Sequence, residues 1–314
     1  MRLCPSTSTR RWWPAPPIST GSTPRAGCAV QPSNPPFPLL VSDLDGTLLT
    51  NQKTVSPETI AALVLAREHG MSLAIASARP FRMIQAVIDP EALALFDAVI
   101  VSNGAAIFSS DGTHVLHEDA LAPEELAVLI THLRALYPDA GFGWESGTAF
   151  GSDRRLLDLT ARGGVLRDPH PDRLSDLPTT SAHQLVLAPG EGVPRDLIAA
   201  IRREIGDTYA VTDSLGGVVE ISPARVTKAD AATVWAESLG HSLAQVVAFG
   251  DEHNDLPLLR AAGLGIAMGN ASDEVRQAAD RATATNTDHG VARALRTLLG
   301  FDEATPLPRF EKNS

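Results

Sequence analysis

An apolar run that ends in two carboxylates constrains the fold of this chain most. Residues 39–42 are apolar or small, and Asp43, Asp45 and Gly46 follow them closely. Such a run is typical of a strand covered on both faces of a parallel sheet, and ligands bind beyond the carboxyl ends of these strands. Side chains two positions apart in an extended segment point the same way. We therefore expect Asp43 and Asp45 to converge on one reacting centre; the alternative is a surface turn, for which Asp-x-Asp-Gly is ordinary chemistry.

Polar groups also follow three further predicted strands and stand at one predicted helix start. Ser77 ends the apolar run 71–76, where it could donate to a phosphoryl oxygen or simply cap a helix. Lys228 lies in the first turn of a predicted helix, where positive partial charge favours an anion nearby; the alternative is a solvated surface lysine. The other candidates are Asn103, after the run 98–101, and Asp251, Asn254 and Asp255, after the run 246–250.

In this order, these stretches resemble the four motifs of the haloacid dehalogenase superfamily. Asn-Gly-Ala at 103–105 and Ala-Met-Gly-Asn-Ala at 267–271 are similar to its Cof-type phosphatases, subfamily IIB, and the resemblance covers about residues 38–300. Two departures stand out: Ala78 replaces the usual glycine after Ser77, and Arg225-Val226 replaces a glycine that often precedes the lysine. The motifs together carry the resemblance, because any one of them alone is a weak signal.

The resemblance and the order of predicted elements imply an α/β fold. We expect a doubly wound, mainly parallel sheet, the Rossmannoid core of the superfamily, with an inserted α+β cap domain that has an antiparallel sheet. The long separation of Asn103 and Lys228 requires such an insertion, because one crossover helix needs far fewer residues. The predicted domains are a discontinuous core of residues 37–118 and 222–301 and a cap of residues 119–221. Within the cap we expect helices at 123–136 and 194–205 and strands near 142–144, 183–187, 208–211 and 218–221.

The two ends of the chain differ from the rest. Residues 1–36 contain four arginines, no acidic residue and many Pro, Ser and Thr, a composition that cannot bury a core. We expect a disordered N-terminal extension, with a start codon assigned too far upstream or an organellar transit peptide as alternatives. Residues 302–314 are expected to form a flexible C-terminal tail.

Charge and cysteine content limit the possible partners. The chain has 26 basic and 37 acidic residues, a net charge of −11, which argues against nucleic acid or an anionic membrane as a partner. It has no apolar run long enough for a transmembrane helix. Both cysteines, Cys4 and Cys28, lie in the N-terminal extension, so the body suits a reducing compartment, and we expect a cytoplasmic monomer or homodimer.

The resemblance implies a Mg²⁺-dependent phosphatase that acts on a small phosphorylated metabolite, such as a sugar phosphate, pyridoxal phosphate or flavin mononucleotide. Asp43 would attack phosphorus and form an aspartyl-phosphate, while Asp45 would act as general acid and base. By the same resemblance, the metal ligands would be Asp43, Asp251 and the backbone carbonyl of Asp45, and Gly46, Ser77, Asn103 and Lys228 would bind the phosphate or substrate. Asn254 and Asp255 could complete or orient the metal's shell, and Asp255 could also pair with Lys228.

Two other functions fit the same motifs. A phosphomutase also forms an aspartyl-phosphate but keeps and rebinds its intermediate. A protein that binds a phosphorylated ligand without turnover would usually have lost the nucleophile, the acid or the lysine, and none is lost here.

Overall fold

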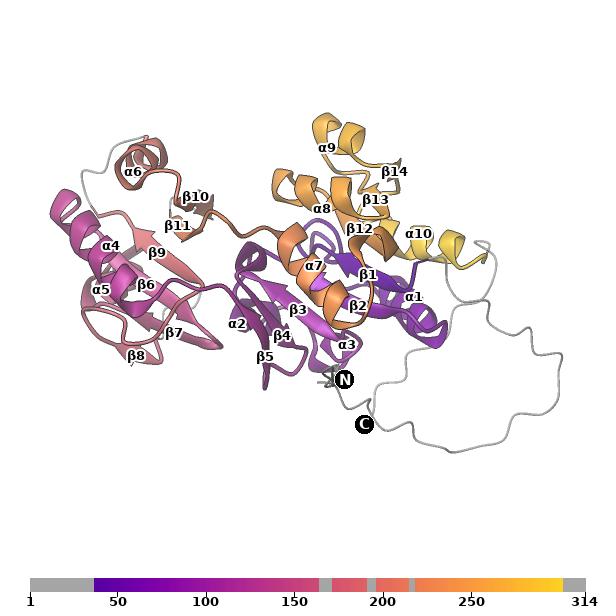
Figure 1. Ribbon diagram of the computed structural model, residues 1–314, viewed down its shortest axis with the longest axis horizontal. Helices are drawn as coiled ribbons and strands as arrows, with labels where there is room; N and C mark the ends of the chain where they lie inside the picture. The colour runs from indigo at the N-terminus through magenta and orange to yellow at the C-terminus, as the bar shows by residue number, and fades with distance from the viewer. Residues whose placement is uncertain (1–36, 164–170, 191–195, 215–217, 302–314) are drawn as a thin grey trace, which may run out of the picture. The chain divides into compact units, whose positions relative to one another are not determined.

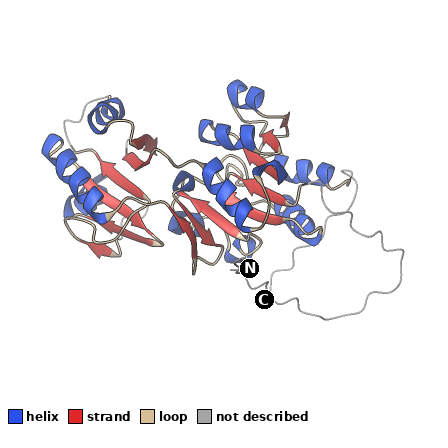
Figure 2. Ribbon diagram, in the orientation of Figure 1, coloured by secondary structure: helices blue, strands red, loops and turns tan. Residues whose placement is uncertain are grey.

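The structure is a computed structural model that describes residues 37–163, 171–190, 196–214 and 218–301 (Figure 1). The expected N-terminal extension and C-terminal tail lie outside the described residues. Figure 2 shows two separate groups of strands, each accompanied by helices. No helix among the described residues has both the length and the apolar character needed to cross a bilayer.

The first sheet contains the strands that precede the predicted site. Its strands are β1 (Leu39–Ser42), β2 (Ser72–Ala76), β3 (Ala98–Val101), β4 (Ala106–Ser109), β5 (Val115–Glu118), β12 (Val246–Gly250), β13 (Leu264–Ala267) and β14 (Arg281–Ala282). They are arranged in the order β14-β13-β12-β1-β2-β3-β4-β5. All neighbours pair in parallel except β3–β4 and β4–β5. This confirms the predicted α/β class with a mainly parallel sheet.

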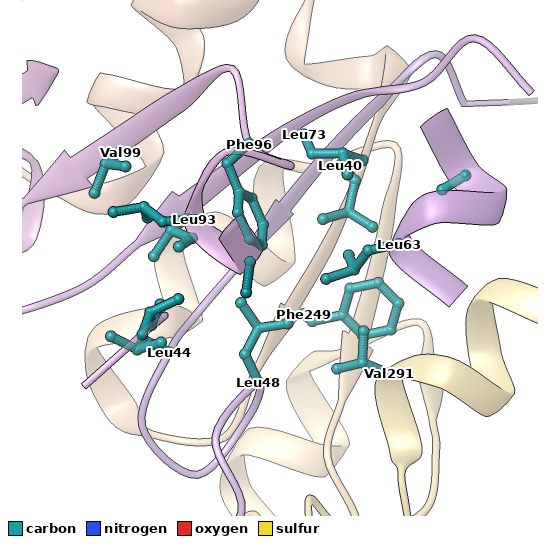
Figure 3. Close-up of a cluster of buried hydrophobic side chains, with 14 of the residues drawn as sticks. Leu40, Leu44, Leu48, Leu63, Leu73, Leu93, Phe96, Val99, Phe249 and Val291 are labelled. Carbon is teal, nitrogen blue, oxygen red and sulfur yellow. The ribbon is translucent and has the colours of Figure 1, made fainter. Parts of the chain in front are cut away.

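Helices cover both faces of this sheet. Successive side chains of its strands belong alternately to two apolar clusters, one on each face. Leu40 and Phe249 contribute to one cluster together with Leu63 of α1 and Val291 of α10 (Figure 3). Val41 belongs to the other cluster, which contains residues of α7, α8 and α9. The α-helices that accompany the sheet are α1 (Pro57–Glu68), α2 (Phe81–Gln85), α3 (Pro90–Leu93), α7 (Lys228–Ser238), α8 (Leu256–Ala261), α9 (Asp273–Ala278) and α10 (Gly290–Leu298).

Side-chain caps fix where two of these helices begin. The Oγ of Ser56 accepts a hydrogen bond from the backbone N–H of Thr59, and Pro57 occupies the first turn of α1, as the sequence predicts. At α7 a capping box joins Thr227 and Asp230 reciprocally. Because the cap is at Thr227, Lys228 becomes the first residue of the helix.

The second sheet is built from the inserted segment. Its strands are β6 (Gly141–Ser146), β7 (Ala149–Ser152), β8 (Arg173–Leu174), β9 (Gln184–Ala188), β10 (Tyr209–Ser214) and β11 (Val218–Pro223), in the order β10-β11-β9-β6-β7-β8. The helices are α4 (Pro123–Leu136), α5 (Arg154–Gly163) and α6 (Leu197–Ile205). The expected antiparallel pairing holds except between β7 and β8, which pair in parallel because α5 connects them. Trp144 is 2 % exposed within the apolar cluster of this unit, so it packs there as a core aromatic.

Candidate active site

The predicted residues meet where the order of strands in the first sheet reverses. β1 lies between β2 and β12, so its carboxyl end is the switch point at which parallel sheets bind ligands. Asp43 directly follows β1, and Asp251 directly follows β12. The backbone N–H of Asp43 donates to the carbonyl of Phe249 at 2.9 Å, which continues the pairing of the two strands up to the carboxylates.

A buried lysine joins two of the carboxylates. The Nζ of Lys228 donates to Asp43 Oδ1 at 2.6 Å and to Asp255 Oδ1 at 2.7 Å. Lys228 is 1 % exposed and Asp255 is fully buried. Burial alone would lower the pKa of Lys228, but the neighbouring Asp255 and Asp43 outweigh it, so this pKa lies above its ordinary value. The ammonium therefore stays charged, and the alternative of a solvated surface lysine is wrong.

Asp43, Asp251 and Asp255 form a cluster that could hold a metal ion. Each offers a carboxylate oxygen within 4.8 Å of the others, and all three are buried. The other oxygen of Asp255 accepts hydrogen bonds from the backbone N–H groups of Asp251 and Glu252 at 3.0 and 3.1 Å. Asp255 is fully buried and bonded to Lys228 and to the loop, whereas Asp43 and Asp251 are 5 % and 7 % exposed and are therefore better placed to bind an ion directly.

Negative charge is in excess here because three carboxylates face one ammonium, and the pKa values of Asp43 and Asp251 are raised. Burial raises the pKa of Asp43 well above its ordinary value, although Lys228 acts against it. Burial also raises the pKa of Asp251 to about 6, while the hydrogen bond from Thr47 lowers it. A divalent cation with hard oxygen ligands would relieve this excess, so the donor set fits Mg²⁺.

The carboxylate of Asp45 is bound by two cations. Arg79 donates from Nε to Oδ2 at 2.5 Å and from Nη2 to Oδ1 at 2.7 Å, and Lys53 donates to Oδ1 at 2.8 Å. Burial raises the pKa of Asp45, but the hydrogen bonds from Arg79 and Lys53 outweigh it, and the net shift is downward. The carboxylate of Asp45 is therefore ionised in this structure.

Hydrogen bonds join the loops that carry the other predicted residues. The backbone N–H of Asn103 donates to the carbonyl of Ser77 at 3.0 Å, and Asn103 Oδ1 accepts from Asn254 Nδ2 at 2.9 Å. Ser77 is buried, and its Oγ accepts from the backbone N–H of Arg79 at 3.1 Å. The loops after β2, β3 and β12 are thus held together, and Asn254 contacts Asn103 in the structure.

Sequence reasoning missed four side chains that contact the predicted residues. Arg79 and Lys53 contact Asp45, while Thr47 and Asn270 contact Asp251. Thr47 and Asn270 lie inside stretches that resemble motifs of the superfamily, but those motifs do not predict which residues they contact. Lys53 has no sequence signal at all, because its contact depends on the turn of the loop after β1.

Comparisons with known proteins point to one family. A family model described as haloacid dehalogenase-like hydrolase matches residues 40–295. The pyridoxal phosphate phosphatase YbhA of Escherichia coli is 31% identical over 81% of this chain and 96% of that protein. The 5-amino-6-(5-phospho-D-ribitylamino)uracil phosphatase YcsE of Bacillus subtilis is 27% identical over 85% of this chain and 98% of that protein. The solved structure of the subclass IIB sugar phosphatase BT4131 superposes with a TM-score of 0.67, 22% identity and coverage of 82% of this chain and 98% of that one, a likeness of fold.

We predict that Mg²⁺ affinity falls as the pH drops below about 6. Bound metal requires the ionised carboxylate of Asp251, so below its raised pKa a proton must leave for each ion that binds, and the apparent affinity weakens by up to about tenfold per pH unit. The protonation of Asp43 acts in the same direction, because its pKa is raised too. Calorimetric titration with Mg²⁺ at about pH 5 and about pH 7.5 measures this difference. Equal dissociation constants at the two pH values would contradict the assignment of Asp251 as a ligand.

Proposed function

We propose that this chain, which belongs to the haloacid dehalogenase-like hydrolase family and is a phosphoric monoester hydrolase, acts on a small phosphorylated metabolite with the help of Mg²⁺. The family match confirms the resemblance drawn from the four motifs. The observation that carries the proposal is the buried contact of Lys228 with Asp43 beside Asp251, because phosphoryl transfer needs positive charge next to the nucleophile.

Asp43 is the nucleophile in this proposal. Its Oδ1 is held by Lys228 at 2.6 Å, which leaves Oδ2 to attack phosphorus in line and form an aspartyl-phosphate. Asp43, Asp251 and the backbone carbonyl of Asp45 would hold Mg²⁺, which neutralises charge on the phosphoryl oxygens. Ser77 and Asn103 lie at the ends of neighbouring strands and donate to the phosphate or substrate, as does the backbone around Gly46.

Asp45 is the general acid and base. Its ion pairs with Arg79 and Lys53 favour the ionised form, which is the form that deprotonates the water that hydrolyses the aspartyl-phosphate. Protonating the leaving oxygen in the first step requires the neutral form. The dual role therefore needs these ion pairs to weaken when an anionic substrate competes for Arg79 and Lys53.

The inserted segment is proposed to choose the substrate. We propose a catalytic core of residues 37–118 and 222–301 and a cap of residues 119–221, because the residues assigned to the chemistry lie outside the cap. The similar proteins named above act, by their names, on pyridoxal phosphate, a ribitylaminouracil phosphate and sugar phosphates. Each of these compounds is a small phosphate monoester, and they differ in the leaving group. We propose the same substrate class for this chain.

A panel of phosphate monoesters tests this substrate class. Phosphate release is measured with Mg²⁺ from pyridoxal phosphate, flavin mononucleotide and several sugar phosphates, and we expect turnover of at least one of them that chelation abolishes. Turnover that requires a bisphosphate primer would identify a phosphomutase instead. Binding of these compounds without turnover would identify a protein that only binds phosphorylated ligands.

Asparagine at positions 43 and 45 should have different effects. We expect Asp43→Asn to abolish turnover and to trap no phosphoenzyme, because the nucleophile and a metal ligand are lost. Asp45→Asn should slow turnover on the order of 10²–10⁴-fold and accumulate phosphoenzyme, because the nucleophile remains but the base is gone. This loss should be smaller for aryl phosphates, whose leaving groups need little protonation.

The measurement is an acid quench with labelled substrate followed by peptide mapping. Asp273→Asn, at an exposed position on α9, is the matched control and should behave like the parent protein. Label on a residue other than Asp43, or full activity of Asp43→Asn, would refute the mechanism.

A further inference from the structure

Asn270 contacts the carboxylate of Asp251 from a loop that the mechanism does not use. It lies after β13, and its Nδ2 donates to Asp251 Oδ2 at 3.1 Å and to the backbone carbonyl of Gly46 at 2.9 Å. Its Oδ1 accepts from the backbone N–H of Asn286 at 3.0 Å. An exposed asparagine is ordinarily solvated, but this one uses both side-chain N–H groups and its carbonyl within the protein.

The chemistry of these partners fixes the orientation of the amide. A backbone N–H can only donate, so the atom of Asn270 that faces Asn286 has to be the oxygen. The nitrogen then faces the Gly46 carbonyl and the Asp251 carboxylate, which can only accept while Asp251 is ionised. Reversing the amide would place oxygen against oxygen at Asp251 and Gly46 and is excluded.

A buried neighbour holds Asn270 in place. Asn286 is 7 % exposed, and its Nδ2 donates to the carbonyl of Leu49 at 2.8 Å and to Asn51 Oδ1 at 3.3 Å. The loop that follows β14 is thereby tied to the loop that follows β1. Asn270 therefore meets Asp251 from an anchored position, although it lies at the surface.

Both oxygens of Asp251 are held. Thr47 Oγ1 donates to Oδ1 at 2.8 Å, opposite the contact of Asn270 with Oδ2. Gly46, at φ +80°, packs so tightly here that a Cβ would lie 2.1 Å from Asp251 Oδ2. The carboxylate can neither rotate nor swing toward Gly46 without losing one of these contacts.

We propose that Asn270 is a positioning residue that holds Asp251 in one orientation and so makes the site select Mg²⁺ over Ca²⁺. Mg²⁺ needs a nearly ideal octahedral arrangement of oxygens, whereas Ca²⁺ accepts irregular shells and carboxylates bound through one or both oxygens. A carboxylate held at both oxygens favours the stricter ion, and a free carboxylate favours the more tolerant one. The inference rests on the proposed function, because it takes Asp251 to be a ligand of Mg²⁺.

The test compares the metal affinities of variants in the full chain. Asn270→Ala removes both donors to Asp251 and Gly46. Calorimetric titration should show Mg²⁺ affinity weakened on the order of 10–100-fold, with a smaller loss for Ca²⁺, so that the preference for Mg²⁺ declines. Thr47→Val, which removes the donor to the other oxygen, should change the preference in the same direction.

Asn51→Ala is the matched control, because it removes only the 3.3 Å contact with Asn286 and leaves Asn286 anchored to the Leu49 carbonyl at 2.8 Å, with every contact of Asn270 intact. Its Mg²⁺ and Ca²⁺ affinities should equal those of the parent protein. If Asn270→Ala does not fold, Asn270→Ser, whose shorter side chain cannot span both acceptors, is measured in the same way. An unchanged ratio of the two affinities in the folded Asn270 variant overturns the inference, even if its melting temperature is lower.

The result separates this inference from the proposed function. A parent protein that hydrolyses phosphate monoesters but shows no Mg²⁺ binding refutes the metal assignment, and with it the role of Asn270. A parent protein that binds Mg²⁺ tightly, with Asn270 variants whose ratio of Mg²⁺ to Ca²⁺ affinity equals that of the parent, refutes the role of Asn270 alone.

Discussion

Three buried carboxylates share one buried ammonium, and the site depends on how that charge is balanced. Asp43, Asp251 and Asp255 together with Lys228 leave a formal excess of two negative charges when all are ionised. Burying charge is costly, and removing one partner of a buried pair typically costs about 3–5 kcal/mol. Burial raises the pKa values of Asp43 and Asp251, and the neighbouring carboxylates add to the effect. A divalent cation would balance the excess of negative charge and keep Asp43 ionised.

The fold brings these groups together from remote parts of the chain. Lys228 is 185 residues from Asp43 and 27 from Asp255, yet both contacts are shorter than 2.8 Å. Two structural features produce this proximity: β12 pairs in parallel with β1, and the capping box at Thr227 starts α7 with the lysine. The insertion after β5 leaves this arrangement intact, because the chain returns to the core through β11, immediately before α7. Chemistry and substrate choice can therefore reside in different segments.

Much of the core could be predicted from the sequence, because its strands are short apolar runs and its helices begin with recognisable caps. The strands β1, β2, β3 and β12 and the helices α1 and α7 follow such signals. β7 gave none, because it has only one large apolar residue, Phe150, among three small ones. Its Gly151 is required since a Cβ there would lie 2.1 Å from the indole nitrogen of Trp144. The two-residue strand β8 is likewise too short to show an apolar pattern.

In the candidate site, the sequence predicts which residues take part but not every contact that they make. The motifs identified Asp43, Lys228 and Asp251, and the pairing of Lys228 with Asp255 was open to inference from their chemistry. The contacts of Arg79 with Asp45 and of Asn270 with Asp251 could not be predicted, because they join loops that no periodic pattern relates. Such contacts depend on the turn taken by each loop, which the surrounding structure decides.

The most direct test of this account is a crystal structure with Mn²⁺ in place of Mg²⁺, examined by anomalous scattering. Mn²⁺ also prefers oxygen ligands, and its anomalous signal locates it without ambiguity. The account predicts one strong peak in contact with the carboxylates of Asp43 and Asp251, with Lys228 still bonded to Asp43 and Asp255. A fully loaded crystal with no peak at these carboxylates, or with its peak elsewhere in the molecule, would contradict it.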